Sequence, residues 1–284
     1  GINLILLNVE TEATIGLALR KEAEKNNAIV TVADGDEPVA ALDLYNFARE
    51  LSFDVISIGK GKNNPFNTFA TPSSLTKEAS LKQMNPKMLT SFVDGTKTMV
   101  EMAALANFLD FNIDIDGMHG IEATYENINQ FYIPKKDGGL LDESQVVDFA
   151  FGIAPGVFAV IYSEDDYVNY EMEYLKMGKG PYWTLARPYH LTSLEIPRTI
   201  RHIMLEKYSK LSAQSWNVEV VAHAKQDIEP GTNLGSIGGD YIYGKAQKTS
   251  SSKGLLPIGI AEDNVVTKAI AKGNPIAIDE VDAQ

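Results

Sequence analysis

The sequence predicts an α/β fold in which a parallel sheet leads into a mixed α/β segment and then into a small β-rich module. Three observations indicate this. Strand-like apolar runs alternate with helical patterns at the start of the chain, both patterns mix in the middle, and short strands separated by Gly, Asn and Pro turns fill the last part. A chain of 284 residues is long enough for about two domains.

The composition excludes several classes of protein. Asp and Glu number 38 against 25 Lys and Arg, and this charge of −13 argues against a nucleic-acid partner. The absence of cysteine excludes disulfides, thiolate zinc sites and cysteine nucleophiles. No apolar run approaches the ~20 residues that span a bilayer. We therefore expect no nucleic-acid or membrane partner, and the absence of cysteine fits a cytoplasmic location. We also expect a homo-oligomer that acts on a small-molecule substrate.

The first elements alternate in type. Residues 2–9 read as a strand that is apolar on both faces, 15–26 as a helix, 28–33 as a strand, 39–51 as a helix and 55–58 as a strand. Strand–helix–strand–helix–strand at this spacing predicts a doubly wound parallel sheet. Such sheets bind their ligands at the carboxyl ends of the strands, so the residues that follow each strand are candidates for function.

The middle of the chain predicts a mixture of helix and strand, and the last part predicts mainly short strands. Residues 97–108 form a helical pattern, and 157–161 read as a strand. From about Trp216 the predicted strands are short and lie at 218–224, 241–243, 255–259, 265–267 and 276–278.

Charged residues follow two of the early strands. Lys60, Lys62 and Asn63 come directly after the third strand, where a lysine can hold a phosphate or polarise a carbonyl oxygen. A solvated loop is the alternative. Asp36 and Glu37 follow the second strand and precede Pro38. They favour a role as caps of the next helix, and a divalent cation held by their oxygens is the other interpretation.

Two further groups of charged residues stand out. Asp94 is placed to cap the helix that carries Lys97 and Glu101, which share a helix face because they are four residues apart. They form either a charged pocket wall or an exposed ion pair. Arg187 and His190 flank a proline turn, where they either bind an anion and transfer protons or act only in structure.

Several motifs together resemble the homoserine-dehydrogenase-like oxidoreductases with a C-terminal SAF (β-clip) domain, a family that includes a 1-deoxy-D-xylulose 5-phosphate reductoisomerase-like enzyme. In the body of the chain these motifs lie at 8–12, 33–38, 59–65, 92–102, 155–158, 174–178 and 187–191. The tail is similar to an SAF domain at 224–228, 229–231, 238–239, 256–259 and 272–273.

The resemblance implies three parts and a cofactor. Residues 1–60 would complete a Rossmann-like NAD(P)-binding domain whose phosphate-binding half precedes Gly1, 61–212 would form the α/β substrate domain, and 213–284 the SAF domain. The cofactor would be NADPH or NADH, with Asn8 and Glu10 beside the nicotinamide. The other candidate residues would then face or support the substrate: Asp36, Glu37, Lys60, Lys62, Asn63, Asp94, Lys97, Glu101, Arg187 and His190.

The implied activity is hydride transfer between NADPH and a carbonyl or alcohol of a small, phosphorylated or carboxylated substrate, as in a reductoisomerase. A lysine would stabilise the alkoxide that develops as hydride arrives. Asp36 and Glu37 stand where true reductoisomerases hold a divalent metal, although the local pattern differs. The alternatives are a homoserine dehydrogenase and a non-catalytic SAF-type ligand-binding protein.

Overall fold

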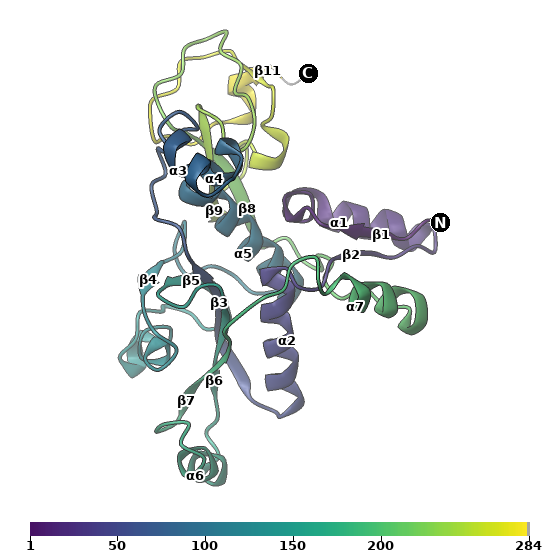
Figure 1. Ribbon diagram of the computed structural model, residues 1–284, viewed down its shortest axis with the longest axis vertical. Coiled ribbons are helices and arrows are strands. Elements are labelled where there is room, and N and C mark those ends of the chain that lie inside the picture. The colour runs from purple at the N-terminus through teal and green to yellow at the C-terminus, as the bar shows by residue number, and fades with distance from the viewer. Residues whose placement is uncertain (283–284) are drawn as a thin grey trace.

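The main sheet has five strands and lies below the C-terminal strands in the view of Figure 1. The structure is a computed structural model and describes residues 1–282. In spatial order the strands are β4 (Ile121–Glu122), β5 (Val146–Phe151), β3 (Asp54–Lys62), β6 (Val157–Tyr162) and β7 (Tyr182–Arg187). β4, β5 and β3 are parallel, and β6 and β7 are antiparallel to their neighbours. The α/β class predicted from the sequence is therefore confirmed.

The first two strands form a separate parallel pair. β1 (Leu4–Leu6) pairs with β2 (Val30–Val32), and α1 (Val9–Lys25) connects them. The strand predicted at 2–9 is present but shorter, and the helix predicted at 15–26 begins earlier, at Val9. The Asn8 side chain accepts a hydrogen bond from the Thr11 backbone N–H at 2.8 Å, which caps the helix and ends the strand early.

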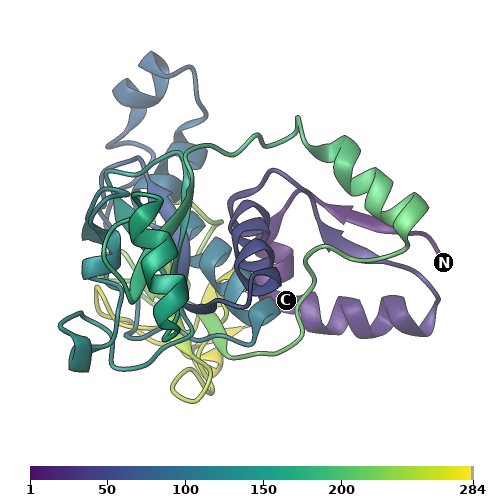
Figure 2. The same cartoon turned by 90° about the horizontal axis from the view of Figure 1, so that it is seen from below.

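The prediction of one parallel sheet through the first three strands is also wrong. After β2, helix α2 (Glu37–Glu50) leads to β3, which belongs to the main sheet. Both edges of β3 are already occupied, by β5 on one side and β6 on the other, so β3 is not available to β2. Figure 2 shows the pair β1–β2 beside the main sheet, between α1 and the segment that contains α7 (Ile196–Arg201).

Helix α5 (Thr96–Leu109) confirms the helix predicted at 97–108 and is buried along most of its length. It packs against α1, α2, the main sheet and the C-terminal strands. Of the shorter helices, α4 (Pro86–Val93) packs against α5 and α3 (Thr76–Leu81) packs against α4, whereas α6 (Asp166–Tyr174) lies at the other end of the molecule, beyond β6 and β7 (Figure 1). A helix that is apolar on nearly all sides needs packing on all sides, so the C-terminal module completes the core around α5.

The C-terminal part is β-rich, as predicted. β8 (Val218–Ala224) matches the prediction, and its partner β9 (Ile242–Lys248) is longer than predicted. β10 (Val265–Val266) pairs with β11 (Val281–Asp282). The segments at 255–259 and 276–278 are not strands, because isolated bridges and 3-10 turns take up their backbone. Within residues 1–282, none of the helices has the length and apolar character needed to cross a bilayer.

Candidate functional site

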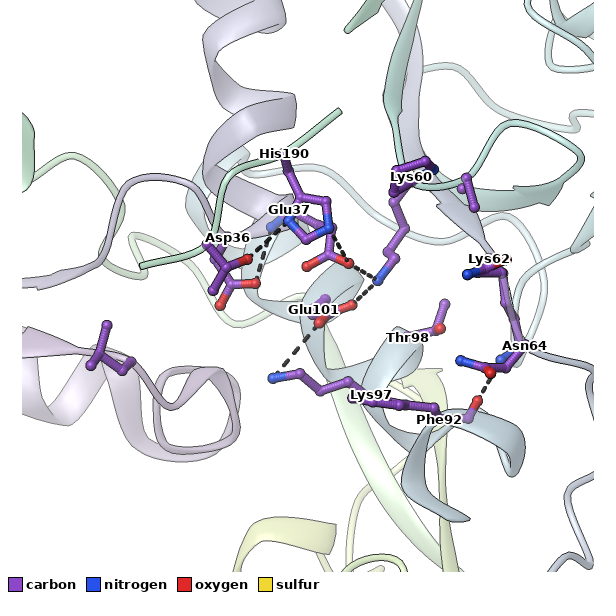
Figure 3. A pocket seen from close by; sticks show the side chains of 16 residues that line it. Asp36, Glu37, Lys60, Lys62, Asn64, Phe92, Lys97, Thr98, Glu101 and His190 are labelled. Atoms are coloured by element: carbon purple, nitrogen blue, oxygen red, sulfur yellow. Dashed lines mark hydrogen bonds and ion pairs between the residues drawn. The ribbon is translucent and has the colours of Figure 1, made fainter. Parts of the chain in front are cut away.

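A cavity of about 360 Å³ opens where the end of β3, the start of α2 and the start of α5 meet (Figure 3). The loop after β7 closes one side of it. Segments far apart in the sequence therefore contribute to one site. Its charged and ionisable lining residues are Asp36, Glu37, Lys60, Lys62, Lys97, Glu101 and His190.

The alternation of β3 places both lysines on one face. Successive side chains of a strand point to opposite faces, so Lys60 and Lys62 point toward the cavity while Gly59 and Gly61 face the other way. A Cβ on Gly61 would lie 2.4 Å from the backbone nitrogen of Ala154, so this position needs glycine. The close backbone approach on the far face thus holds the end of the strand where the two amines enter the cavity.

Lys60 forms ion pairs with two carboxylates. Its Nζ lies 2.8 Å from Glu37 Oε1 and also donates to Glu101 Oε2. Lys60 is buried, which by itself lowers an amine pKa, but the charges of Glu101 and Glu37 outweigh burial and raise the pKa of Lys60. Burial likewise acts against the charge of Glu37, and the ammonium of Lys60 holds the pKa of Glu37 below its usual range. Lys60 is therefore a fixed cation.

Asp36 begins α2 as its N-cap, which confirms capping as a role for this residue. Its side chain accepts a hydrogen bond from the Glu37 backbone N–H at 3.0 Å. Burial and the nearby charge of Glu101 raise the pKa of Asp36 to about 8. Burial and the charge of Glu37 also raise the pKa of Glu101, against the pull of Lys60 and Lys97. The three carboxylates of the cluster therefore retain a proton near neutral pH.

Lys97 joins the cluster from the first turn of α5. Its Nζ lies 3.7 Å from Glu101 Oε1, as the four-residue spacing predicted, and 3.4 Å from Glu10 Oε1. The carboxylates of Glu101 and Glu10 outweigh burial and raise the pKa of Lys97. Lys97 and Glu101 thus form a wall of the cavity rather than an exposed pair.

Lys62 differs from the other two lysines. Its Nζ donates to the backbone carbonyl of Phe92 and lies 5.7 Å from the centre of the Phe66 ring. Burial and the positive charge of Lys60 lower the pKa of Lys62 to about 8. An amine that loses its proton this close to neutral pH is suited to proton transfer.

His190 and Asn63 also line the cavity, as predicted. The Nε2 atom of His190 lies 3.5 Å from Glu37 Oε1, and its Nδ1 atom lies 3.0 Å from the Gly35 carbonyl oxygen. Three residues with polar side chains in the lining were not among the predicted site residues: Asn64, Thr98 and Thr192. Each lies one or two residues from a predicted site residue, namely Asn63, Lys97 or His190, and this proximity was the only sign of them in the sequence.

Asp94 and Arg187 do not line the cavity. Asp94 accepts a hydrogen bond from the Thr96 backbone N–H at 2.9 Å, as expected of a cap at the start of α5. Asp94 forms a buried ion pair with Lys225 of the C-terminal module, at 2.8 Å. Arg187 pairs with Glu195 and lies 3.7 Å from Asp43. Lys225 and Asp43 lie far along the chain from the residues with which they pair, so local sequence does not reveal these contacts.

Asn8 and Glu10 line a second hollow, of about 480 Å³, together with residues of the C-terminal module. Thr14, Ser236 and Glu262 are among its other lining residues. The contact between Glu10 and Lys97 places this hollow next to the main cavity. The two predicted cofactor residues therefore lie beside the charged cluster.

The carboxylates also present a set of oxygen ligands. One oxygen from each of Asp36, Glu37 and Glu101 lies within 4.8 Å of the others. Oxygen donors suit hard cations such as Mg²⁺. In this arrangement the positive charge of Lys60 already balances part of the negative charge of Glu37 and Glu101, which a cation would otherwise do.

The comparisons with known proteins identify the family. No curated protein matches the chain. The family model for the oxidoreductase DRL catalytic domain matches residues 35–196, which is more than half of the chain and carries Lys60, Lys62 and Glu101. The chain therefore belongs to the oxidoreductase DRL family and carries its catalytic domain.

Proposed function

We propose that the cavity reduces the carbonyl group of a small anionic substrate with hydride from NADPH, in a reductoisomerase-like reaction. One observation carries the proposal more than any other. Lys62, with its pKa lowered to about 8, faces a cavity in which the other two lysines are held charged by carboxylates. The family model supports an oxidoreductase, and this amine supplies the proton that a carbonyl reduction needs.

In the proposed reaction Asn8 and Glu10 would hold the nicotinamide of NADPH, and the bound cofactor would supply hydride to the carbonyl carbon and be released as NADP⁺. The π electrons of the carbonyl move to the oxygen, and this oxygen takes a proton from the Lys62 ammonium. Solvent then returns a proton to the neutral amine. Negative charge develops on the oxygen during the transfer, so a proton donor and fixed cations nearby lower the barrier.

The rest of the cluster holds this arrangement in place. Lys60 stays charged between Glu37 and Glu101, and its positive charge helps to lower the pKa of Lys62. The ammonium of Lys97 pairs with Glu101 and lines the same cavity. It therefore presents a second positive charge to an anionic substrate. Asn63 and His190 add hydrogen-bonding groups at the rim.

The proposed place of the nicotinamide is the hollow that Asn8 and Glu10 line. This hollow borders the cluster through the contact between Glu10 and Lys97 at 3.4 Å. A ring bound there would face the cavity from the side opposite to β3, and the substrate carbonyl would lie between the ring and Lys62. This placement rests on the resemblance and on the two adjoining hollows.

A divalent metal is a secondary part of the proposal. Asp36, Glu37 and Glu101 would hold it, and it would polarise the carbonyl oxygen as a Lewis acid. Their donor chemistry fits a hard cation, but the Lys60 ammonium occupies the shared side of Glu37 and Glu101. We therefore expect the cluster to bind Mg²⁺ only weakly unless Lys60 moves away.

The test is NADPH oxidation by the full-length protein with two substrates. Turnover of 1-deoxy-D-xylulose 5-phosphate would support the reductoisomerase-like reaction, and turnover of aspartate semialdehyde alone would assign a homoserine dehydrogenase instead. NADPH titration tests the premise. A protein that binds no NADPH at millimolar concentration would overturn the proposal and favour a non-catalytic ligand-binding protein. Repeating the assay with EDTA and with Mg²⁺ tests the metal.

A further inference from the structure

A buried ion pair connects the C-terminal module to the helix that carries the site. Lys225 Nζ lies 2.8 Å from Asp94 Oδ2 and donates to the Gly239 carbonyl oxygen at 2.8 Å. The side chains of Lys225 and Asp94 are 1% and 0% exposed. Removing two charges from water costs free energy that their attraction repays only in part, so stability alone gives little reason for such a pair.

The pair acts on the first turn of α5. Asp94 Oδ1 accepts a hydrogen bond from the Thr96 backbone N–H at 2.9 Å, which satisfies one of the free donors at the helix start. The hydroxyl of Thr96 accepts a hydrogen bond from the Gly244 backbone N–H at 2.8 Å. Lys225 and Gly244 both belong to the C-terminal module, so this module contacts the first turn at two points.

The same turn adjoins three functional groups. Lys97 extends from it into the cavity, Glu101 follows in the next turn, and the Phe92 carbonyl just before it accepts the hydrogen bond from Lys62. We propose that Lys225 is a positioning residue for the site: through Asp94 it fixes the first turn of α5 and maintains the negative charge that faces Lys62.

The charges of the pair lead to a measurable consequence. Burial raises the pKa of Asp94, and the ammonium of Lys225 opposes that rise. The charge of Asp94 in turn raises the pKa of Lys62 against burial. Without Lys225, buried Asp94 takes up a proton, because an unpaired carboxylate is costly in the interior. Lys62 then loses the charge that favours its protonated form, so its pKa falls.

The experiment follows the Lys62 amine directly, by NMR of lysine labelled with ¹³C and ¹⁵N in the full-length protein. Lys62→Arg identifies the resonance by its loss. We expect the pKa of Lys62 to fall below the wild-type value of about 8 in Lys225→Met, in Asp94→Asn and in the double variant. The double variant leaves no unpaired charge and keeps an oxygen that accepts from Thr96, so it guards against a failure to fold.

Two controls separate positioning from general stability. Lys248→Met removes a lysine of the same module whose ammonium pairs with Glu143 instead, and it should leave the titration of Lys62 unchanged. Lys225→Arg keeps a positive charge beside Asp94, so Lys62 should titrate in this variant as it does in the wild type. A folded double variant in which Lys62 titrates as in the wild type would overturn the inference.

The effect on turnover rests on the proposed function. We expect kcat for NADPH oxidation to fall about 10- to 100-fold in the double variant, because a small displacement of the reacting groups is costly. A double variant with the kcat of Lys248→Met would contradict the positioning role. A wild-type protein that turns over neither substrate, but whose Lys62 pKa falls in the variants, would overturn the proposed function and support the placement of Lys225.

Discussion

Asp36 links the stability of the protein to pH through a single side chain. An aspartate in the unfolded chain loses its proton near its ordinary pKa of 3.8, whereas folded Asp36 keeps the proton to about pH 8. Between these values the folded state binds the extra proton. The contribution of Asp36 to stability is therefore fully present below pH 3.8 and is lost as the pH rises to about 8.

Asp36→Asn tests this dependence. Asparagine keeps the oxygen that caps α2 but has no proton to lose. The free energy of unfolding of the variant, relative to the wild type, should therefore increase from pH 5 to 7.5, by up to about 1.4 kcal/mol per pH unit. Urea unfolding of both proteins across this range measures the difference, which removes the contributions of other groups. A difference that stays constant with pH would show that Asp36 has an ordinary pKa.

Individual site residues were predictable where short-range spacing decides the outcome. Lys60 and Lys62 share a strand face because they are two residues apart, and Lys97 and Glu101 share a helix face because they are four apart. Asp94 caps the start of α5 as predicted, but its buried ion pair with Lys225 was not predicted, because Lys225 lies far along the chain. Local patterns do not encode which distant residue satisfies a buried charge.

At the scale of elements, β3 is the strand on which the site depends. Its two glycines face residues that approach too closely for a side chain, and a Cβ at position 61 would meet the Ala154 nitrogen at 2.4 Å. We expect Gly61→Ala to lower stability by about 1–3 kcal/mol, because overpacking forces backbone shifts. These shifts move Lys60 and Lys62, so kcat should also fall although no functional group is removed. Urea unfolding and NADPH oxidation measure the two effects, and unchanged kcat would show that the site tolerates movement of β3.

The sequence predicted helices better than strand partners. Residues 97–108 show a pattern that matched α5, since helical periodicity is local. The run at 55–58 was correctly read as a strand but assigned to the wrong sheet, because pairing depends on which edges later strands occupy. The early end of the first strand was missed because Asn8 caps a helix there.

At the scale of the whole molecule, the C-terminal module shares its core with the rest of the chain. Apolar residues of α5, such as Met102, and of β8 and β9, such as Val220 and Ala246, belong to one buried cluster. The sequence predicted a separate module from its change of composition at about Trp216. It did not predict this shared core. Helix α5 is buried on nearly all sides, and its apolar pattern does not indicate which elements pack against it.

The shared core predicts cooperative unfolding. The chain has two tryptophans, buried Trp183 in β7 and Trp216 at the entry to the C-terminal module. Trp183→Phe and Trp216→Phe leave one fluorescent reporter each, in different parts of the protein. Each variant unfolded in urea, with circular dichroism recorded on the same sample, should give one midpoint by both methods. A fluorescence midpoint well apart from that of circular dichroism would show that the module unfolds separately.

The pH dependence of carbonyl reduction tests most directly whether Lys62 is the proton donor of the site. In the direction of NADPH oxidation the ammonium form is required, so kcat/KM should fall as the pH rises through about 8. Lys62→Met should lower kcat by about 10²- to 10⁴-fold and abolish this basic limb. Lys135→Met, which removes an exposed lysine that pairs with Asp142 away from the cavity, should preserve both the turnover and the basic limb. A Lys62→Met protein with wild-type turnover and the same pH profile would contradict the account.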